Sequence, residues 1–589
     1  MNTDWNLDNI YSSVNSEEFK IDFEKYRELI NELNNWCRIN FANMDNVKEK
    51  LEKYIEYKNK IMSYDKLMMY ANLAQSTDTT NESIAKAIDI LENAEAETSY
   101  QDTAIVDFVK GIDNLEYIIN SSDLLKAHSF YLSEIKEKGE HTLSAEEEAI
   151  ISKMKNTGSL LWEKQWNQLS STLTVNYNDE EIPLSAARNL AYDKSSGVRK
   201  KAYEAEIKAY KKIEQPAAFC MNGIKGEVIN VAEMRKYNSP LDMTLKESRI
   251  DDKILDAMLS AIDEKLESLQ EYFLIKAKVL GHQGALPFYD LFAPVAESDK
   301  IYTVEEARDF VLSCFYGFSK DLGDFAKSAF EKCWLDLMPK KGKVGGAYCE
   351  TIHSMGESRI LANFGGAFDD VITIAHELGH AFHNTRLFHL SELNSFYPMP
   401  IAETASTFCE SIVVNEALKC AKENEKINIL ENDIMGLTQC IVDIYSRFLF
   451  ENSVFNARKE GTLSCEELNN MMIEAQKKAY GKGLDENCLH KFMWVCKPHY
   501  YDADFNYYNF PYAFGALLSK GLYSIYKKMG SEFLPLYDKL LSASSTMPLY
   551  KVAEIAGIDL YSKEFWLTGL EQIITEIDEL KKMVYNKIL

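Results

Sequence analysis

The stretch TIAHELGHAFH, residues 373–383, places three histidines and a glutamate within two helical turns. On an α-helix, residues four apart lie on one face, so His376 and His380 can present two imidazoles to one metal ion. Glu377 lies beside them and can take a proton from a water that the metal activates. The chain has only 10 histidines in all, and this concentration favours a metal site over a chance match.

A third ligand must come from another part of the chain. Seven residues of helix span about 10 Å, whereas zinc binds histidine nitrogen at about 2 Å, so His383 cannot easily join His376 on one ion. The metzincin pattern would need glycine at position 383 and histidine at position 386, where this sequence has His383 and Arg386. That class of zinc protease is therefore excluded.

Three downstream glutamates are candidates for the third ligand. Glu392 follows the histidines too closely for a returning element, whereas Glu403 opens an amphipathic segment after the turn-forming FYPMP. A second helix packed against the first would bring Glu403 to the metal. Glu410 lies seven residues further on the same face, where it can either hydrogen-bond a ligand histidine or form a simple salt bridge.

Composition limits the possible partners. The chain has 589 residues and a net charge of −26, which argues against nucleic acid and against an anionic membrane surface. The N-terminus has no basic and apolar signal pattern, and no apolar run is long enough to span a membrane. We therefore expect a cytoplasmic protein, and its 11 scattered cysteines are typical of reduced, mostly buried thiols.

Most of the chain has the three- and four-residue apolar spacing of helices, which predicts a mainly α fold. The clearest helical segments are 45–74, 81–97, 145–154, 197–213 and 252–280. Residues 171–185 predict a hairpin that turns at Asn178 and Asp179. Residues 344–352 and 358–366 predict two short strands that lead into the histidine helix, and a mild domain boundary falls near 185–198.

Longer motifs carry a family resemblance. ILANFGGAFDDVITIAHELGHAFH (360–383), followed by PMPIAETASTFCES (398–411), resembles the thimet oligopeptidase family of zinc peptidases, in its oligoendopeptidase F branch. DWNLDNIYSSVNSEEF at the start of the chain, GKVGGAYC before the histidines and PHYYDADFNYYNFPYAFG near the C-terminus are also similar to that branch. The resemblance therefore covers nearly the whole chain.

This resemblance implies one Zn²⁺ per chain, held by His376, His380 and Glu403, with Glu377 as the general base. It implies a large helical body of two lobes around a deep central cleft, with a small β-sheet next to the zinc-binding helix. The implied domains are an N-terminal helical lobe (1–110), a helical oligoendopeptidase subdomain with the hairpin (111–195) and the catalytic domain (196–589). Short, flexible peptides are the implied substrates, and a monomer or small homo-oligomer is expected.

The aromatic segment 499–515 gains a functional interpretation from the same resemblance. Taken alone, it is most simply an aromatic core helix. Amide hydrolysis, however, builds an oxyanion that a phenol or an imidazole can stabilise, and the family resemblance points to His499, Tyr508 and Tyr512. Tyr507 remains an alternative to Tyr508, and Phe510 stands where relatives can have another tyrosine.

The segment before the histidine helix is a candidate substrate site. An exposed strand edge beside that helix can pair with an extended peptide, and the resemblance supports this role for Asn363, Gly365, Gly366 and Ala367. A buried structural hairpin would explain the same glycines.

We therefore expect a zinc endopeptidase that cleaves oligopeptides. A related metallocarboxypeptidase, which trims the C-terminus, is one alternative. A catalytically inactive helical scaffold or peptide-binding protein is another, although the intact Glu377 argues against it. A thermolysin-like aminopeptidase would have a glutamate near position 399, where this chain has Met399. Cobalt or manganese could also occupy such a site.

Overall fold

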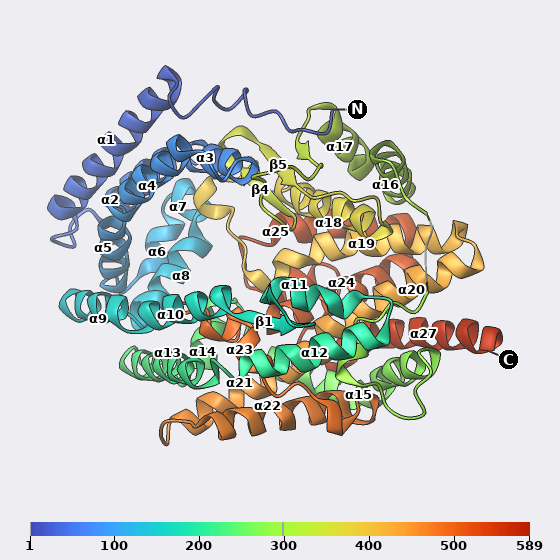
Figure 1. Ribbon diagram of the computed structural model, residues 1–589. Helices are drawn as coiled ribbons and strands as arrows, with labels where there is room; N and C mark the ends of the chain where they lie inside the picture. The colour runs from blue at the N-terminus through green and yellow to red at the C-terminus, as the bar shows by residue number, and fades with distance from the viewer. Residues whose placement is uncertain (1, 297–299, 589) are drawn as a thin grey trace.

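The structure is a computed structural model that describes residues 2–296 and 300–588, and within these residues it is mainly α-helical with two small sheets. The predicted fold class is thereby confirmed. Figure 1 shows the first helices as an arm that curves along one side of the molecule. These helices are α1 (Glu17–Asn40), α2 (Val47–Met62), α3 (Lys66–Thr77), α4 (Glu82–Ala96), α5 (Ser99–Lys110), α6 (Leu115–Asn120), α7 (Asp123–Ala127) and α8 (Ser129–Glu140).

Two helices and a hairpin lead from the arm into the main body. The helices are α9 (Ala145–Thr157), which starts at a capping box between Ser144 and Glu147, and α10 (Ser159–Thr172). Strands β1 (Thr174–Tyr177) and β2 (Glu180–Pro183) pair antiparallel. Asn178 and Asp179 form the turn with φ angles of 56° and 65°, which are the positive values that a two-residue hairpin needs. The predicted hairpin is confirmed.

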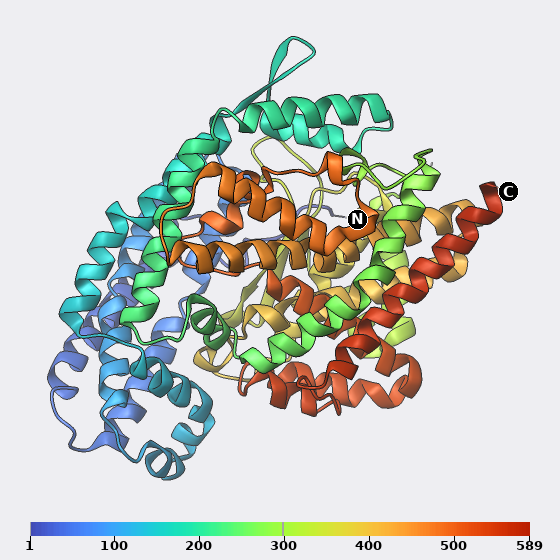
Figure 2. The same ribbon diagram turned by 90° about the horizontal axis from the view of Figure 1, so that it is seen from below.

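The middle of the chain forms the lower part of the view in Figure 1 and then rises to the top right. Its helices are α11 (Leu184–Asn189), α12 (Ser196–Tyr210), α13 (Glu214–Met234), α14 (Pro240–Glu247), α15 (Asp252–Val279), α16 (Val304–Phe318) and α17 (Lys320–Glu331). Figure 2 shows the long α15 running beside the C-terminal helix α27 (Lys563–Ile588), against which it packs.

A three-stranded sheet follows, in the order β3-β5-β4. β4 (Tyr348–Ile352) pairs antiparallel with β5 (Glu357–Leu361), and β3 (Leu335–Asp336) pairs parallel with the other side of β5. The two predicted strands are thus confirmed, with shorter bounds, and β3 was not predicted. Because β5 is the central strand, the segment 358–366 does not offer the free strand edge that we expected; β4 is the edge strand next to it.

The second half of the chain returns to helices. They are α18 (Phe368–Thr385), α19 (Met399–Cys420), α20 (Glu423–Thr438), α21 (Ile444–Arg458), α22 (Cys465–Tyr480), α23 (Met493–Cys496), α24 (Phe510–Met529), α25 (Leu534–Ala543), α26 (Leu549–Glu554) and α27. A π-helical turn, η5 (Gln439–Asp443), joins α20 to α21. α24 contacts α19 on one side and α21 and α27 on others, so it runs through the centre of this half.

The hydrophobic core is divided along the chain. One large cluster extends from Trp166 to Val584 and includes the buried faces of α18, α19 and α24. A second cluster, from Ile30 to Ile135, belongs to the arm. A third joins the N-terminal residues to Ile352 and Leu361 of the sheet. The arm is therefore packed onto the sheet beside α18. No helix among the described residues is long and apolar enough to cross a bilayer.

Candidate metal centre and active site

The candidate metal-binding helix α18 is fixed at its first turn. Asp370 accepts hydrogen bonds from the backbone N–H groups of Gly365 and Ala367, each at 2.9 Å. These bonds satisfy two donors at the helix start, where a carboxylate is also favoured by the helix dipole. The rotation of α18 about its axis is thereby tied to the preceding loop, and this sets the direction in which His376 and His380 point.

Two glycines allow other helices to approach Glu403. A Cβ atom at Gly379 of α18 would lie 2.7 Å from the carbonyl oxygen of Ala405 in α19. A Cβ atom at Gly515 of α24 would lie 3.0 Å from the Cβ of Glu403. Contacts this short exclude a larger side chain, so α19 lies closer to both neighbours than ordinary helix packing permits. Glu403 is thus brought up to the histidines from between α18 and α24.

The three predicted ligands meet at a single point. The Nε2 atoms of His376 and His380 are 3.1 Å apart, and Glu403 Oε2 lies 3.3 Å from the first and 3.5 Å from the second. A tetrahedron with zinc bonds of 2.0–2.1 Å has edges of about 3.3 Å. Three edges of this size leave room for a zinc ion between the ligand atoms. Among the described residues, this is the group whose ligand atoms lie close enough together to hold one metal ion.

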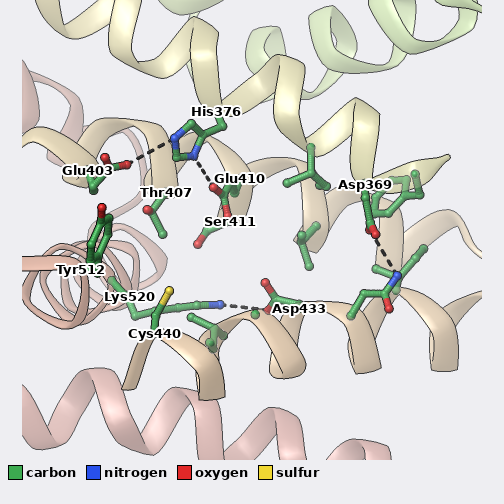
Figure 3. A pocket seen from close by; sticks show the side chains of 18 residues that line it. Asp369, His376, Glu403, Thr407, Glu410, Ser411, Asp433, Cys440, Tyr512 and Lys520 are labelled. Atoms are coloured by element: carbon green, nitrogen blue, oxygen red, sulfur yellow. Dashed lines mark hydrogen bonds and ion pairs between the residues drawn. The ribbon is translucent and has the colours of Figure 1, made fainter. Parts of the chain in front are cut away.

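The second ring nitrogen of His376 also has a hydrogen-bond partner. His376 Nδ1 hydrogen-bonds the Glu410 carboxylate, as Figure 3 shows. A carboxylate in this position fixes the tautomer and the orientation of a ligand imidazole. His383, which we had excluded as a ligand, is fully buried and hydrogen-bonds Ser544 instead, at 2.8 Å.

Glu377 lies on the side of α18 that faces the sheet. Its side chain is 5% exposed, and its charge helps to raise the pKa of the Cys349 thiol in β4, chiefly raised by burial. Burial also raises the pKa of Glu377 itself, against the opposing effect of His376 and His380. Glu377 therefore occupies the boundary between the ligand histidines and the edge strand β4.

A cavity of about 410 Å³ opens beside His376 and Glu403. Figure 3 shows Tyr512 pointing into it from α24, next to Glu403. The opposite wall comes from α20 and η5, which sequence reasoning missed; its residues are Asp433, Gly436, Leu437 and Cys440. No local motif marks them, because they belong to the amphipathic helix α20 and to the π-helical turn that follows it. Lys520 closes the base of the cavity and pairs with Asp433 at 3.2 Å.

His499 and Tyr508 lie next to this cavity without lining it. They line a neighbouring hollow of about 330 Å³, and their rings are 5.2 Å apart. Tyr508 and Tyr512 are 5.9 Å apart, so the three side chains form a continuous aromatic row. Burial lowers the pKa of His499 to about 4, with Arg447 and Lys497 acting in the same direction, and burial raises the pKa of Tyr512. Both groups are neutral near pH 7.

Tyr507 does not belong to this row. It has a positive φ of 53°, and its side chain is 3% exposed and packs on Phe455. Its hydroxyl donates a hydrogen bond to Asn452 at 3.2 Å. Of the two neighbouring tyrosines, Tyr508 is thus the one that faces His499 and Tyr512.

The candidate substrate segment 363–367 is largely engaged with its own chain. Asn363 donates hydrogen bonds to the carbonyl oxygens of Val344 and Gly346 at 3.0 and 2.9 Å. Gly366 has a φ of 95°, and its carbonyl accepts from the Tyr302 N–H at 2.8 Å. The segment therefore forms a rigid loop between β5 and α18, and its role in substrate binding stays a prediction.

Comparisons with known proteins identify relatives of the whole chain. The sequence model described as "Peptidase family M3" matches residues 189–572, and the one described as "Oligopeptidase F" matches residues 112–174. Oligopeptidase PepF of Bacillus subtilis is 26% identical, over 98% of this chain and 87% of the relative. Group B oligopeptidase PepB of Streptococcus agalactiae is 26% identical, over 88% of each chain.

Solved structures show the same fold. A putative peptidase from Chlamydophila abortus has a TM-score of 0.82 and 21% identity, over 99% of this chain and 98% of its own. Oligoendopeptidase-F from Enterococcus faecium has a TM-score of 0.71 and 20% identity, over 97% of this chain and 99% of its own. With a family match that covers well over half of its residues, the chain belongs to peptidase family M3, a family of metallopeptidases.

Proposed function

We propose that this peptidase is a zinc-dependent endopeptidase that hydrolyses internal bonds of short oligopeptides. The observation that carries the proposal is the spacing of His376, His380 and Glu403, whose three ligand atoms lie 3.1 to 3.5 Å apart. The names of the similar oligopeptidases support peptides, rather than folded proteins, as substrates.

The donor set suits zinc. Two imidazole nitrogens and one carboxylate oxygen are a common catalytic zinc set, and a fourth position is left for water or substrate. When bound, zinc acts as a Lewis acid and makes a neighbouring water more acidic. Glu410 keeps the His376 ring in the orientation that directs Nε2 towards the site.

Residues of the chain itself transfer the protons and stabilise the negative charge that develops on the substrate. We assign Glu377 as the general base, which accepts the proton of the attacking water and passes it to the leaving amine. Tyr512 points into the cavity and donates a hydrogen bond to the carbonyl oxygen as that oxygen gains negative charge. His499 and Tyr508 lie in the adjoining row and support the same oxyanion once a peptide is bound.

Peptide digestion followed by mass spectrometry tests this proposal. The purified protein would be incubated with a defined mixture of short and long peptides, with and without a chelator. Internal cuts confined to short peptides, lost on chelation and restored by Zn²⁺, are expected. Glu377→Gln is expected to abolish the cuts while zinc stays bound, and full activity in that variant would refute the role of Glu377. Stepwise loss from the C-terminus would instead indicate a carboxypeptidase.

We further propose a cytoplasmic protein that works as a monomer or a small homo-oligomer. The acidic sequence, with a net charge of −26, suits a protein that associates with neither nucleic acid nor anionic membranes. Cell fractionation and size-exclusion chromatography with light scattering would test the two parts separately.

A further inference from the structure

A second cavity, of about 360 Å³, lies next to the candidate active site. The π-helical turn η5 serves both cavities, because Cys440 lines the first whereas Gln439 and Asp443 line the second. The remaining walls come from α11 and the turn after it (191–192), α12, and the segments 288–292 and 490–497. This segment leads directly into His499, so the second cavity adjoins the aromatic row.

The two cavities are also linked through Tyr192. This side chain lines the second cavity and is 56% exposed. Burial raises the pKa of its phenol and Arg188 lowers it, whereas the carboxylate of Asp369, which lines the first cavity, raises it. This electrostatic interaction joins a residue of one cavity to a residue of the other.

Several charged groups of the second cavity already have partners. Arg199 donates to Asp290 at 2.7 Å and to the carbonyl of Asp193 at 2.6 Å. Asp443 accepts from Tyr480 at 3.0 Å and pairs with Arg447 at 2.5 Å. These four bonds leave Arg199 and Asp443 little capacity to bind a ligand.

Two cations in the cavity remain available. Arg188 has a side chain that is 41% exposed and lies 3.6 Å from Glu206, a long and single contact. The ammonium group of Lys497 forms no hydrogen bond or ion pair within residues 2–296 and 300–588, although the side chain is half-buried. Burial lowers the pKa of Lys497, and the nearby Arg447 lowers it further. A desolvated cation without a partner is unfavourable, and an incoming anion would relieve this cost.

We propose that the second cavity binds a carboxylate of the peptide substrate, with Lys497 and Arg188 as its ligands. The inference rests on the proposed peptidase function, because a peptide supplies this anion in two ways. One is the C-terminal carboxylate, and the other is an acidic side chain. A guanidinium can bind a carboxylate through two parallel hydrogen bonds, and a lysine adds a point charge. The cavity would thus select peptides by the position of a negative charge relative to the cleaved bond.

Calorimetric titration with three related peptides tests the proposal. The first has a free C-terminal carboxylate, the second is its C-terminal amide, and the third is the amide with one internal Glu. Titrations use the zinc-loaded Glu377→Gln protein, and mass spectrometry checks that each peptide stays intact. Because it removes a charge-assisted hydrogen bond, Lys497→Gln should weaken binding of the carboxylate peptide by about tenfold or more. Binding of the plain amide should change less than about twofold.

Arg188→Gln is a second variant, at a partly exposed position where a folding defect is not expected. It should likewise weaken binding of the carboxylate peptide more than binding of the amide. Lys200→Gln is the matched control, because Lys200 is an exposed residue of α12 that does not line the cavity. If only the third peptide responds to the variants, the carboxylate is that of an acidic side chain. If all three peptides bind the variants and the parent protein equally, or lose affinity equally, the proposal is overturned.

Failure of this proposal is distinguishable from failure of the peptidase proposal. Cleavage of the same peptides by the wild-type protein tests the chemistry alone. Retained cleavage with equal KM for acid and amide would refute the carboxylate site and leave the peptidase function intact. Where cleavage is measured, Arg188→Gln should raise KM for the acid and leave kcat nearly unchanged.

Discussion

Gly379 of α18 lies directly against Ala405 of α19, so close that a Cβ atom at position 379 would be 2.7 Å from the Ala405 carbonyl oxygen. This contact sits one residue before His380 and two residues after Glu403 in their respective helices. The separation of the two helices, and with it the distance between the histidines and the glutamate, depends on the absence of a side chain at this position.

Gly379→Ala should therefore separate α18 from α19. Overpacking of a tight contact costs about 1–3 kcal/mol of unfolding free energy, and we expect zinc content to fall as well. Denaturant unfolding and metal analysis would measure both. Gly317→Ala is the control, because Gly317 is an exposed residue of α16 with open space around it. Wild-type zinc affinity in Gly379→Ala would show that the helices do not need this close approach.

Glu410→Gln should weaken zinc binding without removing a ligand. The Glu410 carboxylate holds Nδ1 of His376, and the loss of such a partner typically lowers metal affinity about 10- to 100-fold. Competition with a chelator of known affinity would measure the effect. Glu416→Gln, on the same helix but paired with Lys419 at the surface, should leave zinc affinity unchanged.

Tyr512→Phe should lower kcat by about 10²- to 10³-fold, with little change in KM, if its hydroxyl stabilises the oxyanion. Steady-state kinetics on a single short peptide would measure this. Tyr507→Phe is a matched control, because the Tyr507 hydroxyl bonds Asn452 away from the cavity. Equal losses in both variants would point to a folding effect rather than to catalysis.

Lys225 and Glu451 form a buried ion pair at 2.7 Å that anchors the loop before α24. Lys225 also donates to Asn506 at 2.9 Å, and Glu451 accepts from the Tyr507 N–H at 3.1 Å. Lys225→Met should cost about 3–5 kcal/mol of unfolding free energy, because it leaves Glu451 buried and unpaired. Adding Glu451→Gln should recover part of this loss in urea unfolding. A larger loss in the double variant would exclude an unpaired charge as the cause.

His490 should make the protein less stable in mild acid. Burial lowers its pKa to about 3, whereas an unfolded histidine titrates at about 6.5. Between these values the unfolded chain binds a proton that the folded chain does not, so the free energy of unfolding falls by about 1.4 kcal/mol per pH unit as pH decreases. The effect is absent above pH 6.5. The charged groups around His490 are Glu206, at 4.0 Å, with Arg188 and Lys497 lining the same cavity.

His490→Gln should remove this contribution and leave that of the carboxylates. The comparison is between the slopes of unfolding free energy against pH for the two proteins, from 7 down to 4. Parallel slopes would mean that His490 is protonated in the folded state.

Local sequence patterns were sufficient to predict features that depend only on residues close together in the chain. His376 and His380 share a helical face at fixed spacing, and Asn178 and Asp179 can adopt the positive φ of a hairpin turn. Glu403 could be favoured because it opens an amphipathic segment after the turn-forming FYPMP, and the family resemblance implied the same residue. In contrast, the central place of β5 depends on β3, a strand of two residues with no recognisable pattern. The position of Cys440 depends on how α20 and the π-helical turn after it pack against the rest of the molecule. Helical periodicity in the sequence does not specify that packing.

The π-helical turn η5 makes the wall between the two cavities sensitive to the length of the chain itself. Such a turn holds one residue more than an α-helical turn, and each residue of a helix adds about 100° of rotation. Removing a single residue from Gln439–Asp443 would restore a regular helix and turn everything beyond it. Arg447 and Glu451, which hold the loop through Asn509 and Tyr507, would then face new neighbours. The active site could thus be lost by deletion of one residue, although every proposed metal ligand and catalytic group would still be present.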